Sequence, residues 1–178
     1  LYDQELEKLK SEYRNLPGED PGSRCPDLLK KLDALIKEAE KLRFGKDKEK
    51  QEILNKINKF YDKFSRYYQS QDEFAVLSLL ADDWQAADST TLWDLEDTLI
   101  RNFRVFDEIS YQITNLEMIE TRGNNRYLVH YDLKIVSQIY DKNIKHEEIS
   151  FVREIIEIEE DNSSGRILQT LGGHFWKK

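Results

Sequence analysis

The sequence is poor in the residues that build covalent and metal cross-links. Cys25 is the single cysteine among 178 residues, so no disulfide can form within the chain. The three histidines have no spacing that forces them to converge, so we expect neither a metal site nor a cofactor. A run of 18 apolar residues, the signal of a membrane-spanning helix, is also lacking.

An excess of basic residues is lacking as well. Lysine and arginine total 27 and aspartate and glutamate total 35, which gives a net charge of −8. Residues 1–51 hold equal numbers of acidic and basic residues, so the rest of the chain carries the whole deficit. An acidic body argues against nucleic acid or an anionic membrane as the main partner.

The chain begins at Leu1 rather than at methionine. We therefore expect that a signal peptide, an anchor or another domain preceded it. This expectation favours an extracytoplasmic location, periplasmic or secreted.

Proline is scarce, and its three occurrences all lie in the segment PGEDPGSRCP, residues 17–26. This segment separates a predicted helix at 3–15 from a second one at 27–43, which we expect to end at Gly45. The second helix has a stripe of leucines, and we expect the stripe to be buried on the body or on another chain: Leu28, Leu32, Leu35 and Leu42. The sequence thus predicts a helical hairpin at 1–46 and a separate domain at 47–178.

The second region opens with three helices. The helix predicted at 48–70 has one aromatic and aliphatic face, formed by Ile53, Ile57, Phe60, Tyr61, Phe64, Tyr67 and Tyr68. Asp72 can cap a short helix that follows, and Thr90 or Thr91 can cap a further one at 92–106.

From Asp107 onward the apolar period changes to two. Long strands are predicted at 108–122, 126–140, 144–160 and 166–176. The apolar phase changes between Ile113 and Leu116, which predicts a β-bulge at or next to Asn115. A similar slip is predicted at Ile155–Ile156. Bulges in long strands bend a sheet strongly, so we expect the sheet to close over the helices as a cone.

A turn at DKN, residues 141–143, suggests that Tyr140 faces Ile144. This register places Tyr131 opposite Arg153 on the inward face. His130, Asp132 and His146 then face solvent.

The order of these segments carries a resemblance. The chain is similar to the nuclear transport factor 2-like superfamily, which includes ketosteroid isomerases and SnoaL-like cyclases. The similarity lies in the order of INKFYDKFSRYY, FAVLSLLADDW, LWDLEDTLIRNF and four long strands. The resemblance covers about residues 50–176. It implies an α+β fold, a cone of helices packed on a strongly curved antiparallel sheet of four or more strands. Its enzymes use an aspartate with a tyrosine or histidine inside the cone, but here Asp132 and His130 are predicted to face outward.

The predicted inward face suggests a ligand site. An inward arginine must be paired or reach water, so Arg153 is interpreted either as the partner of Asp88 or Asp94, or stacked on a ring, or as an anchor for an acidic small molecule. Five residues are predicted as ligand-binding: Trp84, Trp93, Tyr131, Arg153 and His174. The ligand is expected to be small and either acidic or apolar.

Our first functional interpretation is a non-catalytic binding or interaction module with a cone-shaped cavity, as part of a larger or exported protein. A protein partner or a homodimer would fit the helical hairpin. The alternative is a small-molecule isomerase, dehydratase or cyclase. A buried acid–base pair in the cone favours the enzyme, and a cone filled by side chains favours the module.

Overall fold

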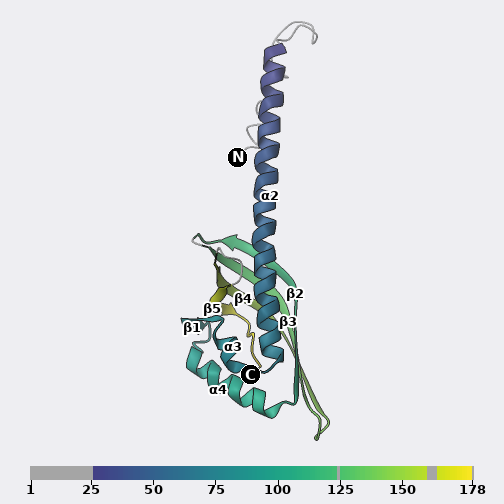
Figure 1. Cartoon of the computed structure of the whole chain (residues 1–178), viewed down its shortest axis with the longest axis vertical. Coiled ribbons are helices and arrows are strands. Elements are labelled where there is room, and N and C mark those ends of the chain that lie inside the picture. The colour runs from purple at the N-terminus through teal and green to yellow at the C-terminus, as the bar shows by residue number, and fades with distance from the viewer. Residues whose placement is uncertain (1–25, 124, 160–163, 178) are drawn as a thin grey trace. The chain divides into compact units, whose positions relative to one another are not determined.

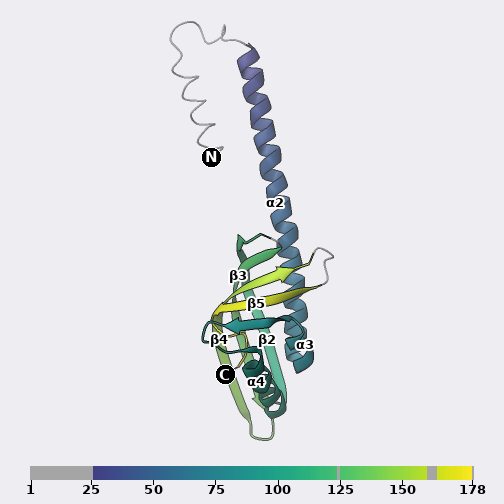
Figure 2. The same ribbon diagram turned by 90° about the vertical axis from the view of Figure 1, so that its left-hand side faces the viewer.

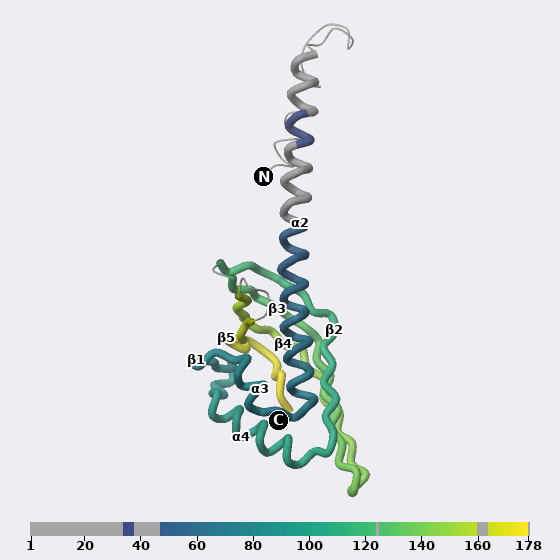
Figure 3. The backbone as a smooth tube through the Cα atoms, viewed as in Figure 1, coloured from purple at the N-terminus to yellow at the C-terminus, as the bar shows by residue number. Residues whose placement is uncertain are grey.

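The structure is a computed structural model that describes residues 26–123, 125–159 and 164–177 (Figure 1). Within the first described helix, side chains are described at 34–37 and from 47 onward (Figure 3). The helix predicted at 3–15, the loop after it and Cys25 lie outside the described residues. Two compact units are present, Leu1–Gln51 and Glu52–Lys178.

A single helix, α2, runs from Pro26 to Gln69, so the predicted break at Gly45 is wrong. One glycine costs a helix only about 1 kcal/mol, and the lysines and glutamates after Gly45 are good helix formers. Leu35 belongs to the first unit and its side chain is 50% exposed. The side chains of Leu28, Leu32 and Leu42 are outside the described residues, so burial of the full stripe stays a prediction.

The second unit contains the rest of the secondary structure. After α2 come α3 (Glu73–Leu77), β1 (Leu80–Ala86), α4 (Leu92–Val105), β2 (Glu108–Thr121), β3 (Arg126–Ile139), β4 (Ile144–Ile158) and β5 (Gly165–Gly172). The four predicted strands are confirmed to within a few residues. The sheet order is β1-β5-β4-β3-β2, and β1 adds a parallel strand beside β5 (Figure 2). The fold is α+β with a five-stranded, mixed, curved sheet.

Irregularities in strand pairing bend this sheet (Figure 1). The β2–β3 register shifts between Thr114 and Glu117, and Asn115 has a φ of 52°. The predicted bulge is therefore confirmed. The β4–β5 register also shifts between Ile155 and Ile156, but the extra residue lies in β5, and β4 alternates without interruption. Bulges increase the local twist, which lets the long strands curve toward the helices.

Aromatic side chains fill the centre of the cone. Residues 52–69 of α2 bury the predicted face, with Tyr61, Phe64 and Tyr68 fully enclosed. Phe64 meets Phe175 edge-to-face at 5.3 Å between ring centroids, and Trp84 meets Phe175 at 5.6 Å. Edge-to-face pairs of this kind add to the stabilisation from burial. The structure thus places packed side chains where an open cone would hold a ligand.

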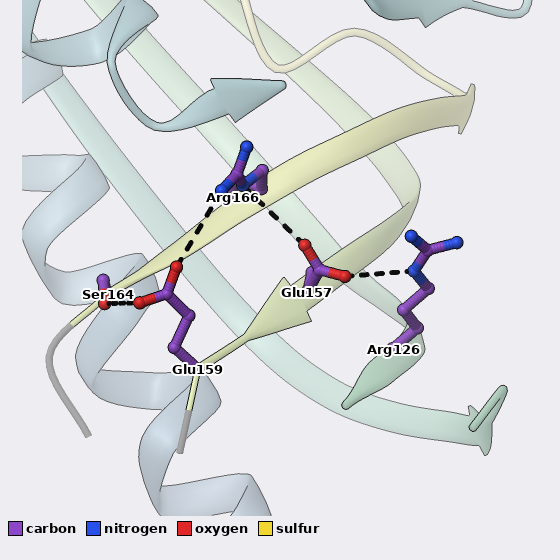
Figure 4. A network of polar contacts seen from close by, with 5 residues as sticks. All are labelled: Arg126, Glu157, Glu159, Ser164 and Arg166. Atoms are coloured by element: carbon purple, nitrogen blue, oxygen red, sulfur yellow. Dashed lines mark hydrogen bonds and ion pairs between the residues drawn. The ribbon is translucent and has the colours of Figure 1, made fainter. Parts of the chain in front are cut away.

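An ion network joins three neighbouring strands on the surface (Figure 4). Glu157 of β4 contacts Arg126 of β3 at 3.1 Å and Arg166 of β5 at 3.8 Å, and Arg166 also reaches Glu159 at 3.8 Å. Ser164 donates a hydrogen bond to Glu159. Exposed pairs contribute little individually, so the network supports the register there rather than the fold as a whole.

Local capping fixes where α4 begins. Thr91 accepts a hydrogen bond from the backbone N–H of Asp94, and the Asp94 carboxylate accepts one from the backbone N–H of Thr91 at 2.9 Å. This is the capping box, and it identifies Thr91 as the cap of the two predicted candidates, Thr90 and Thr91. Asp72 caps α3 in a similar way, because its side chain accepts a hydrogen bond from the backbone N–H of Ala75 at 2.9 Å.

We expect Thr91→Ala to lower the free energy of unfolding by about 1 kcal/mol, because it removes one half of the capping box. Thr98→Ala, within the same helix, is the matched control and should change stability by less than about 0.5 kcal/mol. Urea denaturation of the three proteins measures both effects. Equal stability of Thr91→Ala and the wild type would contradict the capping assignment.

Candidate functional site

A buried glutamate stands in the middle of the β-sheet's inner face. Glu154 lies on β4 between the buried residues Val152 and Ile156, and it is itself 0% exposed. It pairs with Val129 of β3 on one side and Thr170 of β5 on the other. Carboxyl groups are rarely buried this completely unless partners satisfy them.

Three hydroxyl groups donate hydrogen bonds to this carboxyl. The Tyr61 hydroxyl from α2 donates to Glu154 Oε2 at 2.6 Å, and the Tyr131 hydroxyl from β3 donates to the same oxygen at 3.1 Å. Thr170 Oγ1 from β5 donates to Oε1 at 3.1 Å, and Trp84 Nε1 donates to Thr170 Oγ1 at 3.2 Å. Donors from one helix, α2, and two strands, β3 and β5, thus surround a carboxyl carried by a third strand, β4. We call these four residues the Glu154 cluster: Tyr61, Tyr131, Glu154 and Thr170.

Burial raises the pKa of Glu154 from its usual 4.5 to about 7. The hydrogen bonds from Tyr61, Tyr131 and Thr170 act in the opposite direction, since each stabilises the carboxylate. Desolvation is the larger effect, so the group exchanges its proton near neutral pH. A carboxyl with such a pKa is suited to both accepting and donating a proton.

The neighbouring phenols are held neutral. Burial raises the pKa of Tyr61 and of Tyr131 well above the usual 10, and the Glu154 charge raises both further. Burial also raises the pKa of Tyr111, whose hydroxyl lies near that of Tyr131. Among the described residues, the Tyr111 hydroxyl makes no hydrogen bond of ordinary geometry. It is the one tyrosine hydroxyl here that is buried without such a partner in the described part of the chain.

A pocket of about 530 Å³ opens beside this cluster, between α2 and β2. Tyr61 and Tyr111 belong both to its lining and to the surroundings of Glu154. The other lining residues are Asn58, Asp62 and Ser65 of α2 and Gln112, Ile113, Thr114, Asn115 and Leu116 of β2. The tyrosines thus connect a solvent-accessible space with a buried acid.

The inward assignment of Arg153 is wrong, because the β4 register differs by one residue from the prediction. Tyr131 lies opposite Val152, and Ile139 rather than Tyr140 pairs with Ile144. The turn has four residues, closed by a hydrogen bond from Asn143 N–H to the Tyr140 carbonyl at 2.9 Å. A shift of one residue exchanges the two faces of a strand, so Arg153 points outward and is exposed, and Glu154 takes the inward place.

The five predicted ligand-binding residues are not brought together. Tyr131 belongs to the Glu154 cluster, and Trp84 supports it through Thr170. Trp93 is 79% exposed on the first turn of α4. His174 lies with Nε2 3.9 Å from Asp88 Oδ2 and its ring against Trp176. Neither carboxylate proposed for Arg153 serves it: Asp88 faces His174, and Asp94 completes the α4 cap. A ligand role for any of the five stays a prediction.

The outward placement of His130 and Asp132 is confirmed. Both alternate with the buried residues Val129, Tyr131 and Leu133. His130 Nε2 lies 3.3 Å from Glu117 Oε2, and Asp132 Oδ2 accepts a hydrogen bond from Asn115 at 2.7 Å. These two residues do not form an acid–base pair in the cone.

Glu154 was not among the predicted site residues, although the sequence contains a signal for it. Val152, Ile156 and Ile158 occupy alternate positions of β4, and Glu154 is the polar residue among them. A glutamate within an apolar alternation indicates a buried carboxyl. The assumed turn geometry assigned the opposite face and hid this signal.

Among the described residues, no three histidine, cysteine, aspartate or glutamate side chains are grouped so that they could hold a metal ion. None of the described helices is both long enough and apolar enough to cross a membrane.

We expect the stability of the protein to fall as pH rises from about 4.5 to 7, because over this range the Glu154 carboxyl ionises in the unfolded chain while it stays largely protonated in the folded one. Its folded pKa, about 7, lies above the unfolded value of about 4.5. The folded state therefore binds the proton more tightly, and this stabilisation is complete below pH 4.5 and lost above 7. The shift corresponds to roughly 3 kcal/mol.

The pH dependence can be isolated by substitution. Glu154→Gln cannot ionise, so its free energy of unfolding, measured by urea denaturation between pH 5 and 8, should lack this decline. Glu159→Gln removes an exposed carboxylate and should retain it. Parallel pH curves for the wild type and Glu154→Gln would show that Glu154 does not titrate in this range.

Comparisons with known proteins give structural matches only. No family model matches the chain, and no curated protein matches it. Aln2 from a Streptomyces species is 12% identical with a TM-score of 0.55, over 67% of this chain and 88% of its own. A candidate scytalone dehydratase from Novosphingobium aromaticivorans is 10% identical with a TM-score of 0.56, over 70% and 88%.

A candidate dehydratase of the nuclear transport factor 2-like family from Streptomyces avermitilis is also similar. It is 10% identical with a TM-score of 0.55, over 68% of this chain and 95% of its own. At such low identity these matches establish the fold and no activity. Together with the curved sheet and its helices, they show that the chain has the nuclear transport factor 2-like fold.

Proposed function

We propose that the second unit acts on a small molecule by proton transfer, as isomerases, dehydratases and cyclases do. The observation that carries this proposal is the connection between Tyr61 and Glu154. Tyr61 lines the pocket and donates a 2.6 Å hydrogen bond to a buried carboxyl whose pKa is about 7. A perturbed acid beside a cavity is a recurrent feature of catalytic sites.

The chemistry uses Tyr61 as a relay. A carbon next to a carbonyl of the bound molecule gives its proton to the Tyr61 oxygen, while Tyr61 passes its own proton to the Glu154 carboxylate. The electron pair moves to the carbonyl oxygen and forms an enolate. Return of a proton along the same route, to another carbon, completes an isomerisation without a co-reactant. The raised pKa of Tyr61 favours this concerted exchange over a free phenolate.

The names of similar structures agree with this class of reaction. Two of the three are described as candidate dehydratases. Their identity with this chain is 10%, so the support comes from the fold they share with it, and the assignment of residues rests on the geometry above.

The filled cone favours a second candidate, the non-catalytic binding module. Aromatic side chains occupy its centre, and Glu154 is 0% exposed. In this case the Glu154 cluster only joins α2 to the sheet, and the pocket binds its ligand without changing it. A half-exposed Leu35 in the first unit is compatible with residues 1–46 serving a protein partner or a second copy.

Exchange with deuterated water separates the two candidates. The wild type is incubated in D₂O with a panel of β,γ-unsaturated and β-hydroxy ketones, and loss of the α-proton signal is followed by proton NMR. We expect catalysed exchange on at least one ketone, reduced about 100-fold or more in Tyr61→Phe and in Glu154→Gln.

Tyr67→Phe is the matched control, because Tyr67 lies on the same helix outside the cluster and outside the pocket lining. It should exchange at the wild-type rate. Exchange that survives in Glu154→Gln would contradict the relay. Ligand-induced shifts of pocket signals without exchange on any ketone would favour the binding module.

A further inference from the structure

The pocket beside the Glu154 cluster lies along the edge of a strand. Six consecutive residues of β2, Tyr111–Leu116, line it. Neighbouring side chains of a strand point to opposite faces of the sheet, so a pocket on one face would be lined by alternate residues. Because consecutive residues of β2 line this pocket, it lies against the backbone along the edge of β2.

This edge is free of a neighbouring strand. β2 is the last strand of the described sheet, and within that sheet it pairs with β3 alone. Across the described residues, no backbone hydrogen bond joins Tyr111–Leu116 to anything outside the β2–β3 ladder. In any edge strand about half of the N–H and C=O groups point away from the sheet, where they can pair with another chain.

A β-bulge lies within this edge. The β2–β3 register shifts by one residue between Thr114 and Glu117, so Asn115 and Leu116 together stand opposite one residue of β3, Tyr131. The Asn115 side chain is held on the outer face by its 2.7 Å bond to Asp132, which leaves the backbone to form the wall of the pocket. Bulges are frequent next to ligand sites, where they re-aim a side chain or end the regular pairing of the strand.

The facing wall is a polar stripe of α2. Asn58, Asp62 and Ser65 follow one another at helical spacing. Among the residues that the structure describes, Asp62 is the one charged residue of the lining, and no lysine or arginine of these residues contributes to it. This unit also carries the chain's entire net charge of −8. The groove therefore suits a neutral or positively charged ligand better than an acidic one.

We propose that the groove binds a short extended peptide segment, neutral or basic, that adds as a strand to the free edge of β2. Six residues of strand span about 20 Å, enough to pair with a hexapeptide. Main-chain hydrogen bonds supply the affinity in this mode, and Asp62 supplies the charge preference. The inference rests on the proposed function only in taking this pocket as the ligand site, and it does not require proton transfer.

Blocked hexapeptides test the edge directly. The probes are Ac-TKTKTK-NH₂, its counterpart Ac-TETETE-NH₂, and two forms of the first that are N-methylated on alternate residues. Amide shifts of the ¹⁵N-labelled full chain are followed by NMR. We expect the lysine peptide to shift Tyr111–Leu116 and residues 58–65, and the glutamate peptide to bind at least fivefold more weakly.

N-methylation gives the sharpest outcome. Only alternate residues of an added strand donate to the edge, so one methylated peptide should lose at least tenfold in affinity and the other should change by less than about threefold. The proposal would be overturned if both methylated peptides bound as tightly as the unmethylated lysine peptide. It would also be overturned if the amide shifts spread over the acidic surface, or if no peptide bound.

Charge reversal completes the test. Asp62→Lys should weaken the lysine peptide about fivefold, and Asp97→Lys on α4, outside the pocket lining, should leave it within twofold. Glu154→Gln should bind as the wild type does. Loss of ketone exchange with peptide binding intact, or the reverse, therefore tells the two proposals apart. A peptide affinity unaffected by Asp62→Lys would contradict the assigned charge preference.

Discussion

The burial of one carboxyl group fixes how α2, β3, β4 and β5 meet in this domain. Glu154 has no access to water, so its oxygens depend on donors from within the protein. These donors come from α2, β3 and β5, which means that the helix and the sheet must meet in one arrangement for the carboxyl to be satisfied. The aromatic rings around it could pack in several ways, because apolar contacts are non-directional. The hydrogen bonds of Glu154 are directional, and they select one of those packings.

The same burial makes the group chemically responsive. Desolvation raises the pKa of Glu154 to about 7, while three hydrogen bonds restrain the rise. A carboxyl with fewer donors would remain protonated at neutral pH, and one in water would remain ionised. The observed balance keeps both forms accessible. It also implies that the hydrogen-bond pattern must rearrange with protonation, and Tyr111, whose hydroxyl lies near Tyr131, is placed where such a rearrangement could find an additional acceptor.

Much of the architecture was predictable because the relevant signals are local. The change of period at Asp107 located the strands, the phase change after Ile113 located the bulge, and Thr91 located the start of α4. The prediction of which β4 side chains face inward was wrong, because it depends on whether Tyr140 pairs with β4 or belongs to the turn. Tyr140 belongs to a four-residue turn that ends at Asn143, which has a φ of 50°. The continuity of α2 through Gly45 was missed for a different reason. A single glycine weakens a helix by an amount that its neighbours offset, so it is a poor stop signal without proline beside it.

Filling the cone with aromatic rings has a consequence for where a ligand can bind. Space that the fold could leave open at its centre is occupied by Phe64, Tyr68, Trp84 and Phe175, and the pocket lies instead between α2 and the edge of β2. Its link to the interior consists of Tyr61 and Tyr111. A ligand that moves the Tyr61 ring must lengthen or shorten the hydrogen bond from the Tyr61 hydroxyl to Glu154. It thereby changes the energy of the contact that joins α2 to the sheet. Binding of such a ligand and the protonation of Glu154 are therefore coupled through one phenol, and this coupling is reciprocal by thermodynamic necessity, whereas a peptide held by the backbone edge of β2 alone leaves Tyr61 in place and is not coupled.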